Sequence, residues 1–110
     1  MNVSGLDWLM HVKAVPHAHG MLFAFPDGDL ERHFWMKDTI TPLDMIFVAG
    51  DGRVTGVAAD VPASAPDAPL DRIAQRSGEG RYVIELAAGD AARDGIRRGT
   101  HLRIPDIAAQ

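Results

Sequence analysis

Residues 33–48 read HFWMKDTITPLDMIFV, and this stretch decides what kind of fold the chain adopts. Two apolar runs, HFWM and LDMIFV, flank a polar segment that Pro42 closes. Proline lacks an amide hydrogen and pushes the residue before it toward an extended conformation, so strand pairing is expected to resume only after Pro42. The stretch therefore predicts two β-strands joined by a polar bend.

The second run is apolar on both of its alternating faces, and only Asp44 breaks the pattern between Leu43 and Ala49. A strand that is apolar on both faces is normally central, with something packed on each side. We expect Asp44, at the start of this strand, to reach the rim and remain solvated. In the first run, alternation places His33 and Trp35 on one face and Phe34 and Met36 on the other.

Turn signals and apolar runs divide the rest of the chain into short elements. Gly50-Asp51-Gly52 predicts a tight hairpin, because Gly and Asp tolerate the positive φ that such turns require. Gly95 is expected to end a short helix over 89–94, and Ser4 to cap another. Residues 72–76 read as a helical turn, and 77–80 as a loop. The remaining strands are expected at 21–25, 53–60, 81–86 and 101–104.

These elements predict a mainly β protein, a compact β-sandwich or partly closed barrel with one or two short helices. The alternating strand–helix pattern of a parallel sheet is absent from the sequence. At 110 residues, the chain is expected to form a single domain over 1–110.

The composition is that of an ordinary globular protein, with 46% hydrophobic and 24% charged residues. The net charge of −4 argues against a general nucleic-acid binder, because such proteins normally present a basic face. No apolar run approaches the length of roughly 20 residues that spans a bilayer. The chain has no Cys, which excludes disulfides and thiolate chemistry and leaves the redox compartment open.

The sequence also resembles a family of uncharacterised bacterial and archaeal proteins, domain of unknown function 192 (DUF192). The resemblance rests on motifs in order along the chain: GMLF (20–23), FWMKDT (34–39), PLDMIF (42–47), DGRV (51–54), RYVIEL (81–86) and GIRRG (95–99). It implies a compact, mostly β domain, often exported or membrane-tethered, with no agreed catalytic residues. Members usually carry a further strand before the pair seen here as Leu9-Met10, so that first strand is expected to be missing or shortened.

Polar residues within the bend are the leading candidates for a ligand-binding site. A lysine beside carboxylates would hold a polar ligand, and a tryptophan offers a stacking face for a sugar or a base. The candidate residues are Trp35, Lys37, Asp38, Thr39 and Asp44. The alternative is structural: Asp38 and Thr39 would make side-chain to backbone turn bonds, and Lys37 would neutralise Asp44 across the bend.

Two classes of function follow from these residues. The favoured one is a non-catalytic module that binds a small polar ligand or a protein partner at the bend. The alternative is an enzyme of polar or carbohydrate chemistry, with Asp38 and Asp44 as acid and base. Nucleophilic catalysis has little support, because the chain lacks Cys and a Gly-x-Ser-x-Gly motif, and its three Ser residues fall in predicted loops or caps.

No cofactor or metal is expected. His17 and His19 would share one side of an extended segment, with His11 and His33 as further ligands, but zinc needs three or four converging ligands and no spacing here imposes convergence. The amino terminus lacks the features of a signal peptide, so the compartment is either periplasm or cytoplasm. An open strand edge, at 21–25 or a neighbouring strand, favours a homodimer over a monomer.

Overall fold

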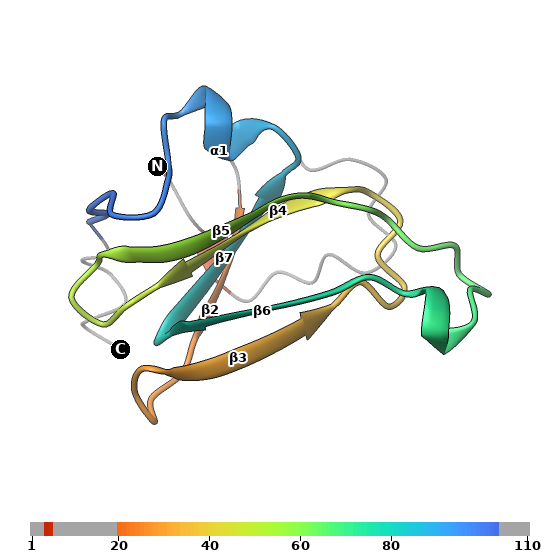
Figure 1. Ribbon diagram of the computed structural model, residues 1–110, viewed down its shortest axis with the longest axis horizontal. Coiled ribbons are helices and arrows are strands. Elements are labelled where there is room, and N and C mark those ends of the chain that lie inside the picture. Colours follow the sequence, from red (N-terminus) through yellow and green to blue (C-terminus); the bar gives the residue numbers. More distant parts are fainter. Residues whose placement is uncertain (1–3, 6–19, 104–110) are drawn as a thin grey trace.

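The protein, seen in a computed structural model that describes residues 4–5 and 20–103, is built from two antiparallel-rich sheets (Figure 1). The five-stranded sheet has the order β1 (Ser4–Gly5), β2 (Gly20–Ala24), β7 (Tyr82–Ala87), β4 (Leu43–Val48) and β5 (Val54–Val61). The second sheet has two strands, β3 (Leu30–Trp35) and β6 (Gln75–Gly80). β1 pairs parallel with β2, and the other pairs are antiparallel. The predicted mainly β fold is confirmed, and the described strands do not close into a barrel.

The central position predicted for the LDMIFV run is confirmed. β4 lies between β7 and β5, and all six of its residues are buried. Its two faces belong to two apolar cores. On one face, Ile46 and Val48 pack with residues of β7 and with Ala91 and Ile96. On the other face, Met45 and Phe47 pack with Met36 and with residues of β3. The layers on either side are the short helix α1 (Asp90–Arg93) and the β3–β6 sheet.

The alternation predicted for the HFWM run is also found. Phe34 and Met36 turn toward the core, whereas His33 and Trp35 are exposed. Along β7, every residue from Tyr82 to Leu86 is buried, because both faces of this strand are covered.

The end of α1 follows the predicted pattern. Gly95 has φ 68°, and its amide donates to the Ala92 carbonyl at 3.2 Å. The Ile96 amide donates to the Ala91 carbonyl at 2.8 Å, which returns the buried Ile96 side chain to the core. This left-handed cap turns the chain back over the sheet.

Four predicted elements differ from the structure. Residues 77–80, expected as a loop, belong to strand β6, and the helical turn expected at 72–76 is replaced by a short 3-10 helix, η1 (Leu70–Arg72). Of the strand expected at 101–104, the described part shows a single bridge between Arg53 and His101, and Ile104 lies outside the described residues. Ser4, expected to cap a helix, is in β1, and residues 6–10 of that predicted helix are not described.

β6 forms despite its poor strand composition because of its neighbours. It pairs with β3 along its whole length, from Leu30 opposite Gly80 to Trp35 opposite Gln75. A Cβ atom at Gly78 would lie 2.4 Å from the ring of Phe47, so only glycine lets β6 approach the core this closely. Backbone pairing and glycine fit therefore outweigh intrinsic propensity here.

The strand edges bear on self-association. β2 pairs with β7 along its length and with β1 at Met21 and Leu22, so the outermost strands of the large sheet are β1 and β5. The homodimer stays a prediction.

The Gly50-Asp51-Gly52 hairpin is confirmed between β4 and β5. Gly52 has φ 93°, and its amide donates to the Ala49 carbonyl at 2.9 Å. We expect Gly52→Val to lower the free energy of unfolding by at least about 2 kcal/mol, because left-handed backbone strains a β-branched residue. In addition, the Cβ atom of a valine at position 52 would lie 2.3 Å from the Leu102 carbonyl oxygen. Urea denaturation measures the loss, and Gly56→Val is the control because its Cβ meets no atom within 4 Å. Equal stabilities of the two variants would contradict the hairpin assignment.

Candidate functional site

The bend between β3 and β4 is a tight turn fixed by main-chain hydrogen bonds. The Thr39 amide donates to the Met36 carbonyl at 3.0 Å, and the Thr39 hydroxyl donates to the Lys37 carbonyl at 3.3 Å. Asp38, between them, has φ 56°. Ser64 supports the turn from the loop after β5: its amide donates to the Thr39 carbonyl at 2.9 Å, and its hydroxyl donates to the Met36 carbonyl. Thr39 is thus a buried part of the turn.

Two of the predicted site residues form an exposed pair at this bend. The Trp35 side chain is 45% exposed, and the Lys37 Nζ lies 5.4 Å from the centroid of its ring. Such a cation–π contact is worth about 0.5–1 kcal/mol at an exposed position. The indole is accessible, but the lysine already occupies part of its face.

Asp44 does not remain solvated at the rim, and this prediction is wrong. Its side chain is 1% exposed, and its carboxylate accepts three main-chain hydrogen bonds. One oxygen accepts from the Asp60 amide at 2.8 Å, and the other accepts from Gly89 at 3.0 Å and Ala91 at 2.9 Å. The carboxylate therefore joins the end of β5 and the start of α1 to the central strand. A group held by three amides is stabilised as an acceptor and is poorly placed to act as an acid or base on a substrate.

The expected pairing of Lys37 with Asp44 is also absent. Among the described residues no ion pair joins them, and the hydrogen-bond partners of Asp44 come from β5, the residue before α1 and α1 itself. The reason is strand geometry: Asp44 shares its face of β4 with Ile46 and Val48, the face that α1 covers.

Glu85 is a second buried carboxyl group that the sequence reading did not single out. It lies in β7 opposite Met21 on one side and Met45 on the other, and it is 7% exposed. Burial among these apolar neighbours raises the pKa of Glu85 to about 7. Within the described residues, no backbone amide donates a hydrogen bond to its carboxyl group.

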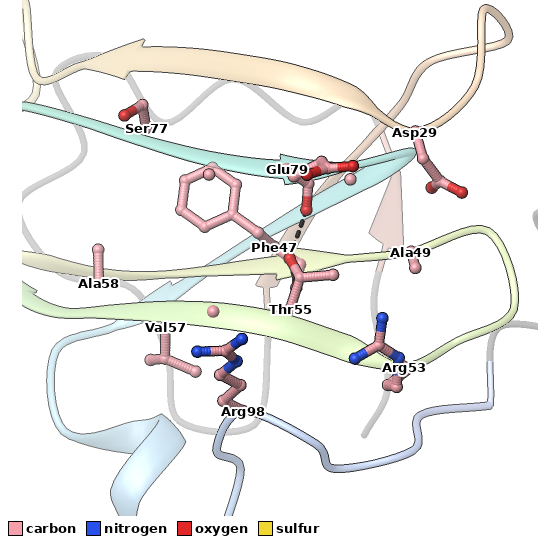
Figure 2. A pocket seen from close by; sticks show the side chains of 13 residues that line it. Asp29, Phe47, Ala49, Arg53, Thr55, Val57, Ala58, Ser77, Glu79 and Arg98 are labelled. Carbon is pink, nitrogen blue, oxygen red and sulfur yellow. Dashed lines mark hydrogen bonds between the residues drawn. The ribbon is translucent and has the colours of Figure 1, made fainter.

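A groove between β5 and β6 forms a cavity in the part of the chain that the structure describes (Figure 2). Its volume is about 430 Å³, which is within the range of small-molecule sites. β5 forms one wall, the edge of β6 forms the other, and the Phe47 ring of β4 lies between them. At one position the walls are tied together, where the Thr55 hydroxyl donates to the Glu79 carbonyl. None of the five predicted site residues lines this groove.

Small residues leave the backbone of both walls accessible. Gly56 and Ala58 stand on β5, opposite Phe47 and Met45 in the register, and Gly78 and Gly80 stand on β6. A Cβ atom at Gly56 would meet nothing within 4 Å, so this position opens into the groove. By contrast, a Cβ atom at Gly78 or Gly80 would collide with the core or with the backbone of Val48.

Charges are separated across the groove. Figure 2 shows the guanidinium groups of Arg53 and Arg98 on the β5 side, and Asp29 and Glu79 at the β6 side. Within the described residues, neither arginine forms an ion pair. Arg32 differs, because it binds Asp27 at 2.7 Å and the Gly80 carbonyl at 2.9 Å. The bond from Arg32 lowers the pKa of Asp27. Arg53 and Arg98 are therefore the cations available to a ligand.

A metal centre finds no support among residues 4–5 and 20–103, where no group of three or more His, Asp or Glu converges. His33 is exposed and lies 3.6 Å from Glu31. His11, His17 and His19 are outside the described residues.

The groove was missed in the sequence because its parts are unremarkable there. Ser77-Gly78-Glu79-Gly80 reads as a loop, and Arg53 and Arg98 are 45 positions apart in a chain with eleven Lys and Arg. The pairing of β6 with β3 makes residues 77–80 a strand, and hydrogen bonds of Val54 to Gly99 and Thr100 bring Arg98 to the same groove as Arg53. The one usable signal was glycine at alternate positions, 78 and 80, beside an apolar strand.

The fold and groove define a two-sheet β domain with an open, amphipathic groove. The chain belongs to the DUF192 family: the family model, described as "Uncharacterized ACR", matches residues 4–104. This confirms the resemblance seen in the motifs. Among curated proteins, none matches the chain.

Two solved structures are similar to the whole fold. A Sinorhizobium meliloti protein named "putative transcription regulator" is 31% identical, with a TM-score of 0.73, over 92% of this chain and 78% of that one. A Novosphingobium aromaticivorans protein of unknown function is also 31% identical, with a TM-score of 0.70, over 93% of this chain and 72% of that one. Within the described residues, the structure has no helix long and apolar enough to span a membrane.

Proposed function

We propose that this protein is a non-catalytic binding module whose ligand occupies the β5–β6 groove. The observation that carries the proposal is a cavity of about 430 Å³ whose β5 wall carries two arginines that form no ion pair within the described residues. Binding sites typically combine an apolar surface with a few polar groups that fix orientation. The groove offers the half-buried Val57 and Ala58 as the first and Arg53 and Arg98 as the second.

The bend remains a second candidate surface for a polar ligand, on the specific observation that Trp35 is 45% exposed beside Lys37. Asp38 lies next to this pair. The enzyme alternative is weaker, because its proposed base, Asp44, is buried and already accepts three amides.

The name of the Sinorhizobium protein raises nucleic acid as a ligand. The net charge of −4 disfavours it, and Arg53 and Arg98 face Asp29 and Glu79 across the groove. A duplex would require a broader basic surface. The ligand that fits these walls is smaller and makes local contacts with the two arginines.

Gly56→Val tests the groove directly, because valine suits a strand and would project into the cavity from a position with free space. In a thermal-shift screen of sugars, nucleotides, carboxylates and short peptides, a compound at a hundred times its dissociation constant stabilises the wild type by about 2.7 kcal/mol. This corresponds to a rise in melting temperature on the order of 10 °C. We expect Gly56→Val to abolish the rise while melting like the wild type without ligand.

The matched control is Trp35→Ala at the bend, which should leave a groove ligand unaffected. The opposite pattern, with stabilisation lost in Trp35→Ala and kept in Gly56→Val, would move the site to the bend. If no compound stabilises the wild type differently from Gly56→Val, the groove is not a binding site.

A further inference from the structure

We infer that the ligand of this groove is a small molecule with one oxyanion, held by Arg53 and Arg98, and with hydrogen-bond donors at its other end. The inference rests on the proposed function and names the class of ligand that the groove would take. Two features carry it: both arginines stand on main chain that hydrogen bonds fix, and the two walls of the groove carry charges of opposite sign.

Arg98 stands in a turn that hydrogen bonds close from both ends. The Thr100 amide donates to the Arg97 carbonyl at 2.9 Å, and the Arg97 amide donates to the Thr100 hydroxyl at 3.0 Å. Gly99, which follows Arg98, has φ 91°, a conformation that glycine adopts without strain. The turn is also bonded to β5: the Val54 amide donates to the Thr100 carbonyl, and the Gly99 amide donates to the Val54 carbonyl, each at 2.8 Å. The main chain that carries Arg98 is therefore held against β5.

The main chain of Arg53 is fixed beside that turn. Its amide donates to the Asp51 carboxylate at 3.0 Å, its carbonyl accepts from the Ala49 amide at 2.9 Å, and it forms a β-bridge with His101. Both arginine side chains are exposed, and within the described residues neither guanidinium forms an ion pair. Guanidinium groups on a fixed main chain are prepared for a ligand, because little backbone freedom is lost when the ligand binds.

The local charge favours an anion at this end of the groove. Residues 93–103 contain four arginines and a single aspartate, in a chain whose net charge is −4. Arg53 lies beside this segment through its bridge to His101. Clustered cations raise the local concentration of anionic ligands, and a guanidinium binds a carboxylate or a phosphate through two parallel hydrogen bonds. We therefore place the oxyanion at Arg53 and Arg98.

The opposite wall restricts the rest of the ligand. Figure 2 shows the carboxylates of Asp29 and Glu79 on the β6 side, and both residues are exposed. A second anion there would face charges of its own sign, whereas a hydroxyl or an ammonium group would donate hydrogen bonds to these oxygens. The groove therefore fits a molecule that is anionic at one end only, such as a hydroxy acid or an amino acid, and disfavours dicarboxylates and polyanions.

Four six-carbon acids test this inference, because they share a carboxylate and differ at the far end. Gluconate carries hydroxyls, 6-aminohexanoate an ammonium group, hexanoate a methyl group and adipate a second carboxylate. In titrations followed by ¹⁵N–¹H NMR spectra, we expect gluconate or 6-aminohexanoate to bind about tenfold more tightly than hexanoate, and adipate to bind most weakly. Glucose, which lacks the anion, should bind more weakly than gluconate. Glucose 6-phosphate, run beside gluconate, distinguishes a phosphate from a carboxylate as the oxyanion.

Substitutions on the two walls test each end of the ligand separately. Arg53→Gln and Arg98→Gln should each weaken binding of the tightest acid about tenfold, because a charge-assisted hydrogen bond is lost. Both variants keep the main-chain bonds and should melt like the wild type. Glu79→Gln should reduce the discrimination against adipate, because it removes one of the two like charges. Arg76→Gln, outside the groove lining, is the matched control and should leave all affinities unchanged.

The inference is overturned if no acid binds, if adipate or glucose binds as tightly as gluconate and 6-aminohexanoate, or if the two arginine variants leave the affinities unchanged. Failure of the groove itself gives a different result, because binding that Gly56→Val leaves intact lies elsewhere. A compound whose binding is lost in Gly56→Val but kept in both arginine variants would retain the groove as the site and remove the anion.

Discussion

Asp44→Asn is expected to lower the free energy of unfolding by about 2–4 kcal/mol, a large fraction of the 5–15 kcal/mol typical of such domains. The substitution keeps the size of the side chain but replaces an acceptor oxygen by a donor that faces backbone amides. Three amides, from Asp60, Gly89 and Ala91, converge on this carboxylate at 2.8–3.0 Å. At least one would lose its partner in a site that is 1% exposed.

The matched control for this variant is Asp51→Asn. Asp51 also accepts a main-chain hydrogen bond, from Arg53 at 3.0 Å, but it is exposed and the bond is single. Urea denaturation at pH 7 should show a loss below about 1 kcal/mol there, because water replaces the lost acceptor. If Asp44→Asn is no more destabilising than Asp51→Asn, the carboxylate is not the link between β4, β5 and α1.

Glu85→Gln is expected to remove a pH dependence of stability that the wild type carries. The folded-state pKa of Glu85 is raised from 4.5 to about 7 by burial. Below pH 4.5 the carboxyl is protonated in both states, and burial carries no charge penalty. As the pH rises through 7, the folded protein must bury a carboxylate, and stability falls. Between pH 4.5 and about pH 7 the free energy of unfolding falls by about 3 kcal/mol, since one pKa unit corresponds to about 1.4 kcal/mol.

The measurement is a set of urea titrations of wild type and Glu85→Gln at pH 5 and pH 8. Between pH 5 and pH 8, the free energy of unfolding of the wild type should fall by about 3 kcal/mol more than that of Glu85→Gln. Glu79→Gln is the control, because Glu79 is exposed and should leave the pH dependence unchanged. Identical pH profiles for wild type and Glu85→Gln would show that this carboxyl is solvated.

The local structure of the bend follows from its residues, whereas a function of the bend does not. The polar insert between two apolar strands is a turn, as Pro42 and the Asp-Thr pair predict, and Thr39 makes the expected bond to the Lys37 carbonyl. Its density of polar residues suggested a ligand site. In the structure, Thr39 is buried, while Trp35 and Lys37 contact each other at the surface. Whether they also bind a ligand stays a prediction.

The central strand, the hairpin at Gly52 and the cap at Gly95 follow from the local amino-acid sequence. Each is set by local physics: apolar residues on both faces of β4, and backbone conformations that glycine adopts without strain. These features need no knowledge of distant residues. The motifs of the DUF192 family lie largely in the same segments, which is why the resemblance was readable.

Only the tertiary structure decided the environment of Asp44, the strand β6 and the groove. A carboxylate at a strand end is solvated or buried according to what covers it, and Asp44 is buried because α1, 46 to 49 positions later, lies over its face. Likewise, a glycine-rich segment becomes a strand when β3 supplies backbone partners and Phe47 leaves room for no side chain. These outcomes depend on long-range pairing, which no local pattern of residues encodes.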